Sequence, residues 1–155
     1  MNNRRSFIVG IKSIKLSTKE KYFLKKYKPW GIILFSRNIK NINQTSKLTS
    51  SIRTIFNDKK YPILIDQEGG RVNRLNKIIS FDNLTSEFFG NQFIKNHKEF
   101  NFFYKLFIDK TSYLLKSIGA NINTTPVLDL NLKGASNIIG DRSFSKDPNI
   151  VSKIG

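Results

Sequence analysis

A carboxylate and two arginines follow directly after a short apolar run near the middle of the chain. The run at residues 63–65 ends at Asp66, and the glycine pair 69–70, Arg71 and Arg74 come next. Such a run is typical of a buried parallel strand, and α/β proteins place ligand-binding groups at the carboxyl ends of these strands. A carboxylate there can accept charge-assisted hydrogen bonds from two neighbouring hydroxyl groups, and the glycines permit a tight turn close to a ligand.

Asp66 also has a structural interpretation, in which its carboxylate caps the next loop by accepting backbone N–H groups. Position alone does not separate the two interpretations. Arginine presents five donors in a fixed plane and stays charged, so Arg74 is a second candidate for binding ligand oxygens. Arg142, in the polar loop Ile-Gly-Asp-Arg-Ser-Phe, is the third. These three residues are the candidate binding residues.

The charged and polar neighbours of these residues are expected to support them. Arg71 is expected to form an ion pair with Glu68 or Asp141, and we interpret Glu68 as a residue that holds the loop rather than as a general acid. Residues 37–38, Arg-Asn, and Asp129 follow two other predicted strands. Because strands of a parallel sheet end at the same edge, these residues are expected to hold the binding residues in place without contacting the ligand themselves.

Strand-like and helix-like segments alternate along the chain, as they do in α/β proteins with a parallel sheet. Residues 76–92 are polar and are expected to be irregular, and His97 is interpreted as a solvated surface residue. The expected strands are residues 7–11, 31–35, 62–65 and 121–124 with 126–128. A helix is expected over 93–118, with a core-packing stripe made of Phe93, Phe100, Phe103, Phe107, Leu114 and Ile118.

Capping residues mark the ends of the expected helices. Residues 17–20, Ser-Thr-Lys-Glu, predict a capping box at the start of a helix that ends near residue 27. Asn43 or Thr45 is expected to cap the next helix, and Gly119 to end the long one. Residues 147–148, Asp-Pro, predict the start of a fourth helix, inside which the chain ends.

The charge of the chain is strongly positive. Its 155 residues include 27 Lys and Arg against 11 Asp and Glu, a formal net charge of +16. Charge alone suggests nucleic acid or an anionic surface as a partner. The lysines are scattered, however, and Asn, Ile and Phe are also abundant, so we attribute the charge to compositional bias and expect no nucleic-acid partner.

Other features of the composition exclude whole classes of site. The chain has no cysteine, which excludes disulfides and thiolate metal ligands. No apolar run approaches the length of a membrane helix, and no membrane partner is expected. A cytoplasmic location is therefore the expectation.

Three segments resemble family 3 glycoside hydrolases. Residues 66–72, Asp-Gln-Glu-Gly-Gly-Arg-Val, resemble the family signature, and more narrowly that of the bacterial β-N-acetylhexosaminidase branch of peptidoglycan recycling. Residues 31–38 resemble the second strand and its loop, and residues 120–129 with 139–144 resemble the fourth. Three matches in the family's order are far more specific than one motif. The resemblance runs from about Phe7 to the last residue.

The resemblance implies a (β/α)8 TIM-type barrel, of which this chain holds about the first four β/α units. Since a complete barrel typically needs about 250 residues, residues 1–155 are expected to be the N-terminal half of one glycosidase domain, truncated at the C-terminus. A C-terminal half-barrel is then an expected partner, because four units leave open sheet edges.

The resemblance also implies a function, the retaining hydrolysis of terminal N-acetylglucosamine from muropeptide fragments. The family residue that matches Asp66 binds ring hydroxyls of N-acetylglucosamine, and those matching Arg74 and Arg142 bind substrate. The nucleophile is a downstream Asp and the acid/base a His on a mobile loop, and the Lys-His-Phe-Pro-Gly-His segment is absent here. No residue of this chain is therefore assigned as catalytic, and no metal or organic cofactor is implied.

Two alternatives stay open. One is a family 3 β-glucosidase-like hydrolase, although residues 67–70, Gln-Glu-Gly-Gly, argue against it. The other is a non-catalytic half-barrel that binds sugar or an anionic polymer. The chain also departs locally from the family, since residues 81–84 lack the usual proline and Asn73 stands where Gln is usual.

Overall fold

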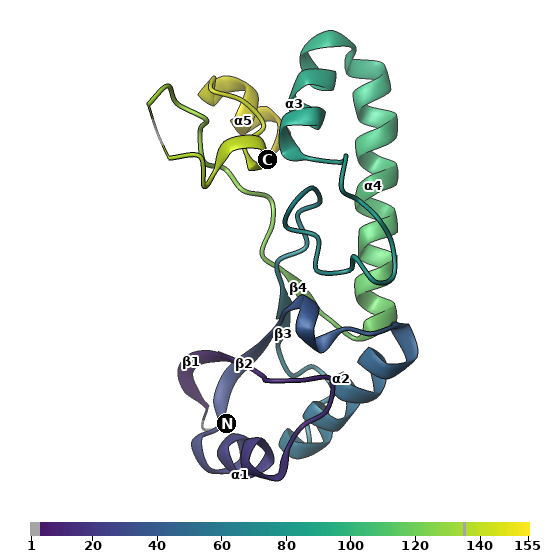
Figure 1. Ribbon diagram of the computed structural model, residues 1–155, viewed down its shortest axis with the longest axis vertical. Coiled ribbons are helices and arrows are strands. Elements are labelled where there is room, and N and C mark those ends of the chain that lie inside the picture. Colours follow the sequence, from purple (N-terminus) through teal and green to yellow (C-terminus); the bar gives the residue numbers. More distant parts are fainter. Residues whose placement is uncertain (1–3, 135) are drawn as a thin grey trace. The chain divides into compact units, whose positions relative to one another are not determined.

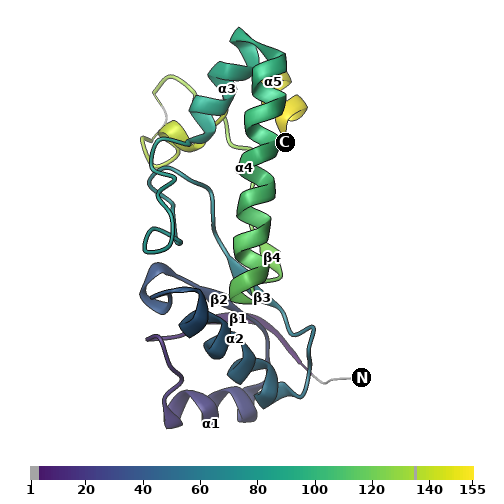
Figure 2. The same cartoon turned by 90° about the vertical axis from the view of Figure 1, so that its right-hand side faces the viewer.

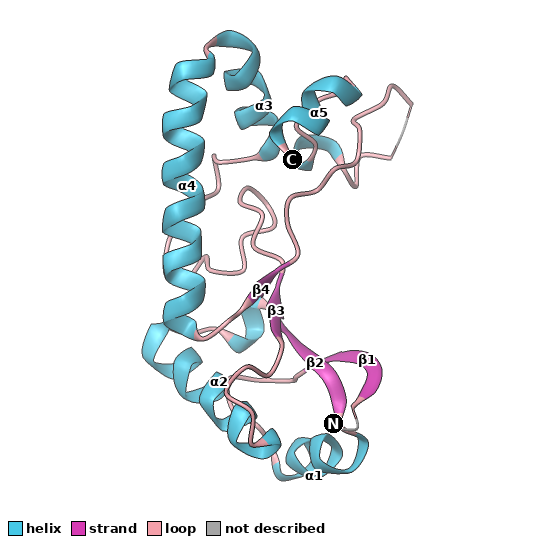
Figure 3. Ribbon diagram, turned by 180° about the vertical axis from the view of Figure 1, so that it is seen from behind, coloured by secondary structure: helices cyan, strands magenta, loops and turns pink. Residues whose placement is uncertain are grey.

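Four parallel strands form one sheet in the computed structural model, which describes residues 4–134 and 136–155 (Figures 1 and 3). The strands are paired in the order β1-β2-β3-β4, and each neighbouring pair is parallel. This order is the one expected for consecutive β/α units of a barrel, and it confirms an α/β fold with about four such units. Their bounds are β1 Arg5–Gly10, β2 Pro29–Leu34, β3 Ile63–Ile65 and β4 Ile122–Asn123.

The chain divides into two compact units. The sheet unit comprises residues up to 66, 74–79 and 112–124, and it contains all four strands. The helical unit comprises residues 67–73, 80–111 and 125–155. None of the described helices combines the length and the apolar character needed to cross a membrane.

The sheet unit also contains α1 (Thr18–Tyr27) and α2 (Ile42–Phe56), which lie side by side (Figure 2), and residues 112–118 at the end of the long helix α4 (His97–Ile118). Thr49 on α2 donates a hydrogen bond to the carbonyl of Ile118 at 2.9 Å, and Arg53 donates to that of Gly119 at 2.7 Å. These two bonds attach the segment that leads into β4 to α2. The core side chains of the sheet unit with no exposed surface are Ile32, Leu34, Ile39, Ile52, Tyr61, Ile63, Ile65, Leu75 and Ile118.

Three of the four capping predictions are confirmed by the structure. Ser17 and Glu20 form the predicted capping box, and Gly119 adopts a positive φ of 81° at the end of the long helix. Asp147 caps α5 (Pro148–Ile154). The predicted cap of α2 was wrong: Asn41 accepts from the Gln44 N–H, so Asn43 and Thr45 already lie inside the helix.

The capping box makes a testable contribution to stability. Burial raises the pKa of Glu20, but hydrogen bonds from Ser17 and from backbone N–H groups together outweigh it, so the pKa is lowered. We expect Ser17→Ala to reduce the free energy of unfolding by about 1 kcal/mol at neutral pH, measured by urea denaturation. Ser50→Ala, an exposed serine inside α2, is the control. Because Glu20 has a lowered pKa, its share of this contribution is lost as the pH falls through that pKa. Equal midpoints for the two variants would contradict the assignment.

The helical unit contains α3 (Ser86–Lys95), residues 97–111 of α4 (His97–Ile118), and α5. The prediction that residues 76–92 are irregular was wrong from residue 86 onward, because Thr85 accepts from the Phe88 N–H and starts α3. The prediction of one helix over 93–118 was also wrong. Asn96 leaves the helical conformation at φ −157°, ends α3, and accepts N–H groups of the first turn of α4.

The residues of the predicted stripe lie in three environments. Phe103 is 51% exposed and does not belong to a core. Leu114 and Ile118 are buried in the sheet unit. The remaining members, Phe93, Phe100 and Phe107, pack instead with Phe89 and Phe144 in the core of the helical unit.

The fourth strand is shorter than predicted. It covers only Ile122–Asn123, and residues 126–128 are not part of the sheet. The Thr125–Pro126 peptide bond is cis, and Leu128 is 57% exposed. A proline cannot donate to a sheet ladder, which explains why the strand ends before it.

Candidate active site

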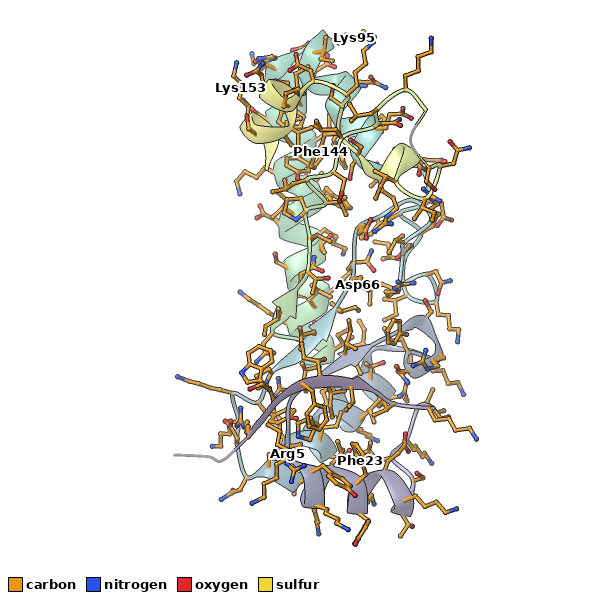
Figure 4. The ribbon with its side chains drawn as sticks, turned by 90° about the vertical axis from the view of Figure 1, so that its left-hand side faces the viewer. Arg5, Phe23, Asp66, Lys95, Phe144 and Lys153 are labelled. Atoms are coloured by element: carbon orange, nitrogen blue, oxygen red, sulfur yellow. The ribbon has the colours of Figure 1, made fainter. Side chains whose placement is uncertain are left out.

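Asp66 lies directly after β3, at the carboxyl end of the sheet, as the sequence predicts (Figure 4). Thr124, directly after β4, donates its hydroxyl to the Oδ1 atom of Asp66, and its backbone N–H bonds the Ile65 carbonyl at 3.0 Å. Adjacent parallel strands place residues that follow their ends side by side. The carboxylate of Asp66 is 27% exposed, so it is held on one side and open to solvent.

Arg74 is the partner of Asp66. Its Nη2 atom lies 3.5 Å from Oδ2 of Asp66, and its guanidinium carbon lies 5.5 Å from the ring centroid of Phe35, which follows β2. The Nε atom of Arg74 is buried and has no hydrogen-bond partner among the described residues. The Arg74 side chain as a whole is 27% exposed, so part of it is open to a ligand.

Residues 37 and 38 fasten the end of β2 to the segment after β1. Asn38 is fully buried, donates to the carbonyls of Ile11 and Ser13 at 3.0 Å, and accepts the Phe35 N–H at 2.9 Å. Arg37 donates to the same Ile11 carbonyl at 2.9 Å, and its guanidinium lies 4.5 Å from the Phe35 ring centroid. Both residues therefore orient Phe35, the ring on which Arg74 lies.

Arg142 belongs to the helical unit, where it forms a two-point ion pair with Glu68. Its Nε and Nη2 atoms each donate to one oxygen of the Glu68 carboxylate at 2.8 Å. The Glu68 side chain is 8% exposed, while that of Arg142 is 25% exposed. Two parallel charge-assisted bonds give a defined orientation as well as attraction. The interpretation of Glu68 as a residue that holds the loop agrees with this geometry.

Arg71 pairs with Asp141, one of its two predicted partners, at 2.9 Å. The same guanidinium donates to the carbonyls of Asn137, Ile138 and Ile139 at 3.0, 2.7 and 2.8 Å. Arg71 therefore contacts residues 137–139 and 141, which directly precede Arg142.

The structure brings two of the three predicted binding residues into contact, Asp66 and Arg74 in the sheet unit, and it pairs Arg142 with Glu68 in the helical unit. Thr124 was missed by sequence reasoning because it was predicted to be the last residue of the strand 121–124, whereas β4 ends at Asn123; a polar residue at the end of a predicted strand was the available signal. Asp129 contributes its backbone carbonyl, which accepts from Ser143 at 2.6 Å.

Histidine and acidic residues are dispersed in the part of the chain that the structure describes. His97 is exposed and lies 4.2 Å from Phe93, ring centroid to centroid, as expected for a surface residue. Among residues 4–134 and 136–155, no three His, Asp or Glu side chains are grouped so that they could hold a metal ion.

Known proteins resemble this chain in sequence and in structure. A family model described as the glycosyl hydrolase family 3 N terminal domain matches residues 6–155. The β-hexosaminidase of Hydrogenovibrio crunogenus is 35% identical over 148 residues, covering 96% of this chain and 41% of that protein. The chain therefore spans about two fifths of the length of this relative.

Solved structures give the same picture. The crystal structure of native NagZ from Neisseria gonorrhoeae superposes with a TM-score of 0.84 at 29% identity, covering 97% of this chain and 43% of the other. A structure of the same protein in complex with N-trifluoroacetyl-D-glucosamine has a TM-score of 0.74 at 28% identity, covering 97% and 45%.

Proposed function

This chain belongs to glycosyl hydrolase family 3, and from that premise we propose that it forms the sugar-binding part of a hydrolase acting on terminal, non-reducing N-acetylglucosamine. Peptidoglycan (muropeptide) fragments are the proposed substrate and the cytoplasm the proposed location. The observation that carries the proposal is Asp66, which the sheet places directly after β3 with Arg74 beside it. The similarity to a NagZ solved with N-trifluoroacetyl-D-glucosamine supports the class of ligand.

Each candidate residue has a defined task in this proposal. Asp66 accepts hydrogen bonds from two neighbouring ring hydroxyls through a carboxylate that Thr124 holds on one side. Arg74 donates to a sugar oxygen through the exposed part of its side chain. Arg142, oriented by Glu68, donates to a further oxygen of the substrate.

The proposed reaction is hydrolysis with retention of configuration. A carboxylate nucleophile displaces the leaving sugar while an acid/base group protonates its oxygen, and water then hydrolyses the glycosyl-enzyme intermediate. No residue of this chain is proposed for either role, so its contribution is to bind and orient the sugar. The proposal includes no metal or organic cofactor.

A C-terminal half-barrel is the proposed partner. In the described sheet, β1 and β4 are the two outer strands. Outer strands can pair with further strands through their free backbone groups, and in a (β/α)8 barrel four more units close the ring. Covalent continuation or a separate chain would serve this purpose equally.

The choice of sugar tests the proposal directly. We expect the chain to bind N-acetylglucosamine at least about tenfold more tightly than glucose, because the acetamido group that replaces the 2-hydroxyl of glucose reaches farther from the ring with its carbonyl acceptor and adds a methyl group that can be buried. Isothermal titration of the chain with each sugar gives the two affinities. Equal affinities would favour the β-glucosidase-like alternative, and no binding of either sugar would count against a sugar-binding function.

Titration with DNA at two salt concentrations tests the anionic-polymer alternative, which predicts a steep loss of affinity with salt.

A further inference from the structure

Two ion pairs join two segments of the helical unit. One segment is the turn that carries Glu68 and Arg71, and the other is η2 (Gly140–Arg142), which carries Asp141 and Arg142. The arginine of each segment bonds the carboxylate of the other, Arg142 with Glu68 and Arg71 with Asp141. The segments are about seventy residues apart in sequence, so each pair is a tertiary contact.

The two arginines do different things. Arg142 places Nε and Nη2 on the two oxygens of one nearly buried carboxylate. Arg71 distributes its donors over four acceptors, the Asp141 carboxylate and three consecutive carbonyls of residues 137–139. These three carbonyls converge on the single Nη2 atom of Arg71, so they must share its two hydrogens.

The backbone is shaped to allow this arrangement. Gly69 and Gly70 adopt φ values of 95° and 53°, and the Gly70 N–H bonds the Phe81 carbonyl at 2.9 Å. On the other segment, Gly140 has φ 45°, and a Cβ atom there would lie 3.3 Å from Nη2 of Arg71. Glycine therefore lets residue 140 approach the Arg71 guanidinium closely and lets residues 69–70 adopt the positive φ values of their turn.

An exposed ion pair by itself contributes little to stability, and the Arg71 and Asp141 side chains are 47% and 38% exposed. The value of Arg71 is geometric, because one planar group defines the path of the loop that immediately precedes Arg142. The Arg142 N–H itself bonds the Ile139 carbonyl at 2.9 Å, and that carbonyl is one of the three that Arg71 holds. Arg71 and the backbone of Arg142 therefore bond the same carbonyl, which links the position of Arg71 to that of Arg142.

We infer that Arg71 is a positioning residue for Arg142: it holds the loop of residues 137–141 so that the Arg142 guanidinium lies on Glu68 in the orientation that binds substrate. The inference rests on the proposed function for the role of Arg142 toward sugar. It also predicts that lysine is a poor substitute at position 71, since an ammonium group cannot hold a planar array of carbonyls and a carboxylate together.

The Nε–H proton of Arg142 reports its orientation directly, because this proton donates to Glu68. We expect Arg71→Gln to speed its exchange with water about tenfold by nitrogen-15 NMR, and to weaken N-acetylglucosamine binding about tenfold by titration. Arg71→Lys is expected to give intermediate values. The signal is assigned by its loss in Arg142→Lys. Lys105→Gln is the matched control. It removes the exposed ion pair between Lys105 and Asp109 on α4, away from both segments, and leaves both quantities unchanged.

The outcomes separate the inference from the proposed function. Unchanged exchange of the Arg142 Nε–H in Arg71→Gln overturns the positioning role, whether or not the affinity for N-acetylglucosamine changes. Faster exchange with undiminished sugar affinity overturns the link between this loop and binding. If the unaltered chain binds no sugar, the proposed function fails, while faster exchange in Arg71→Gln still supports the positioning of Arg142.

Discussion

Asp66→Asn is expected to weaken binding of N-acetylglucosamine by more than about tenfold, the largest effect on ligand binding among the substitutions considered. A carboxylate accepts charge-assisted hydrogen bonds from hydroxyl groups, each worth about 1.5–3 kcal/mol. Asparagine keeps nearly the same shape but has no charge and offers only one acceptor oxygen. Titration calorimetry with the sugar measures the change.

The choice of asparagine limits damage to the fold. Asp66 receives the Thr124 hydroxyl and faces Arg74, so alanine would leave both without their partner. Asparagine can still accept from Thr124 through its carbonyl oxygen. Asp82→Asn is the control for charge, because Asp82 is exposed and accepts from Ser80 at 2.8 Å within its own turn. Urea unfolding of both variants tells a binding defect from a folding defect.

A normal affinity in Asp66→Asn would show that Asp66 only caps its loop, which was the structural interpretation of its position. The proposal would then lose the observation that carries it. A loss of affinity with unchanged unfolding would instead establish Asp66 as a residue that contacts the sugar.

Gly69→Ala is expected to cost about 3 kcal/mol of stability, the largest effect on folding. Gly69 has φ 95°, a conformation that costs alanine roughly 1 kcal/mol. The added Cβ would also overlap the Leu84 carbonyl oxygen, and relieving such overpacking costs roughly 1–3 kcal/mol more. The contacting atom is the backbone oxygen of Leu84, so rotating a side chain cannot relieve the overlap.

Gly134→Ala is the matched control. Gly134 has a similar φ of 82°, but a Cβ atom there would meet nothing within 4 Å. Its substitution should therefore cost only the backbone strain, roughly 1 kcal/mol. Urea unfolding followed by circular dichroism measures both variants. Equal losses would mean that the turn at Gly69 relaxes to admit a methyl group and that close packing is not why glycine occurs there.

Much of the local structure follows from the sequence, because it depends on neighbours within a few residues. The capping box at Ser17, the cap at Asp147 and the positive φ at Gly119 all rest on short-range backbone hydrogen bonds or sterics. Asn41 was missed because several polar residues near the start of α2 can cap, and only the observed hydrogen bond selects one.

The errors in the long helix have a different cause. Phenylalanines at helical spacing continue across Asn96, so periodicity shows one helix where the structure has α3 and α4. Periodicity also cannot say what covers each face of a helix. Phe103 follows the helical spacing but is 51% exposed, whereas Phe100 is 5% exposed against the core of the helical unit.

The sequence by itself determined the alternation of strands and helices, the family, and the position of Asp66 at the end of a strand, because apolar patterning and motif spacing are local properties. Only the tertiary structure decided the pairing of charges. Arg71 had two acidic candidates and pairs with Asp141, which leaves Glu68 to Arg142, and Thr124 reaches Asp66. These contacts join residues about sixty to seventy-five positions apart, and pairing at that separation depends on how strands and loops are brought together in the fold.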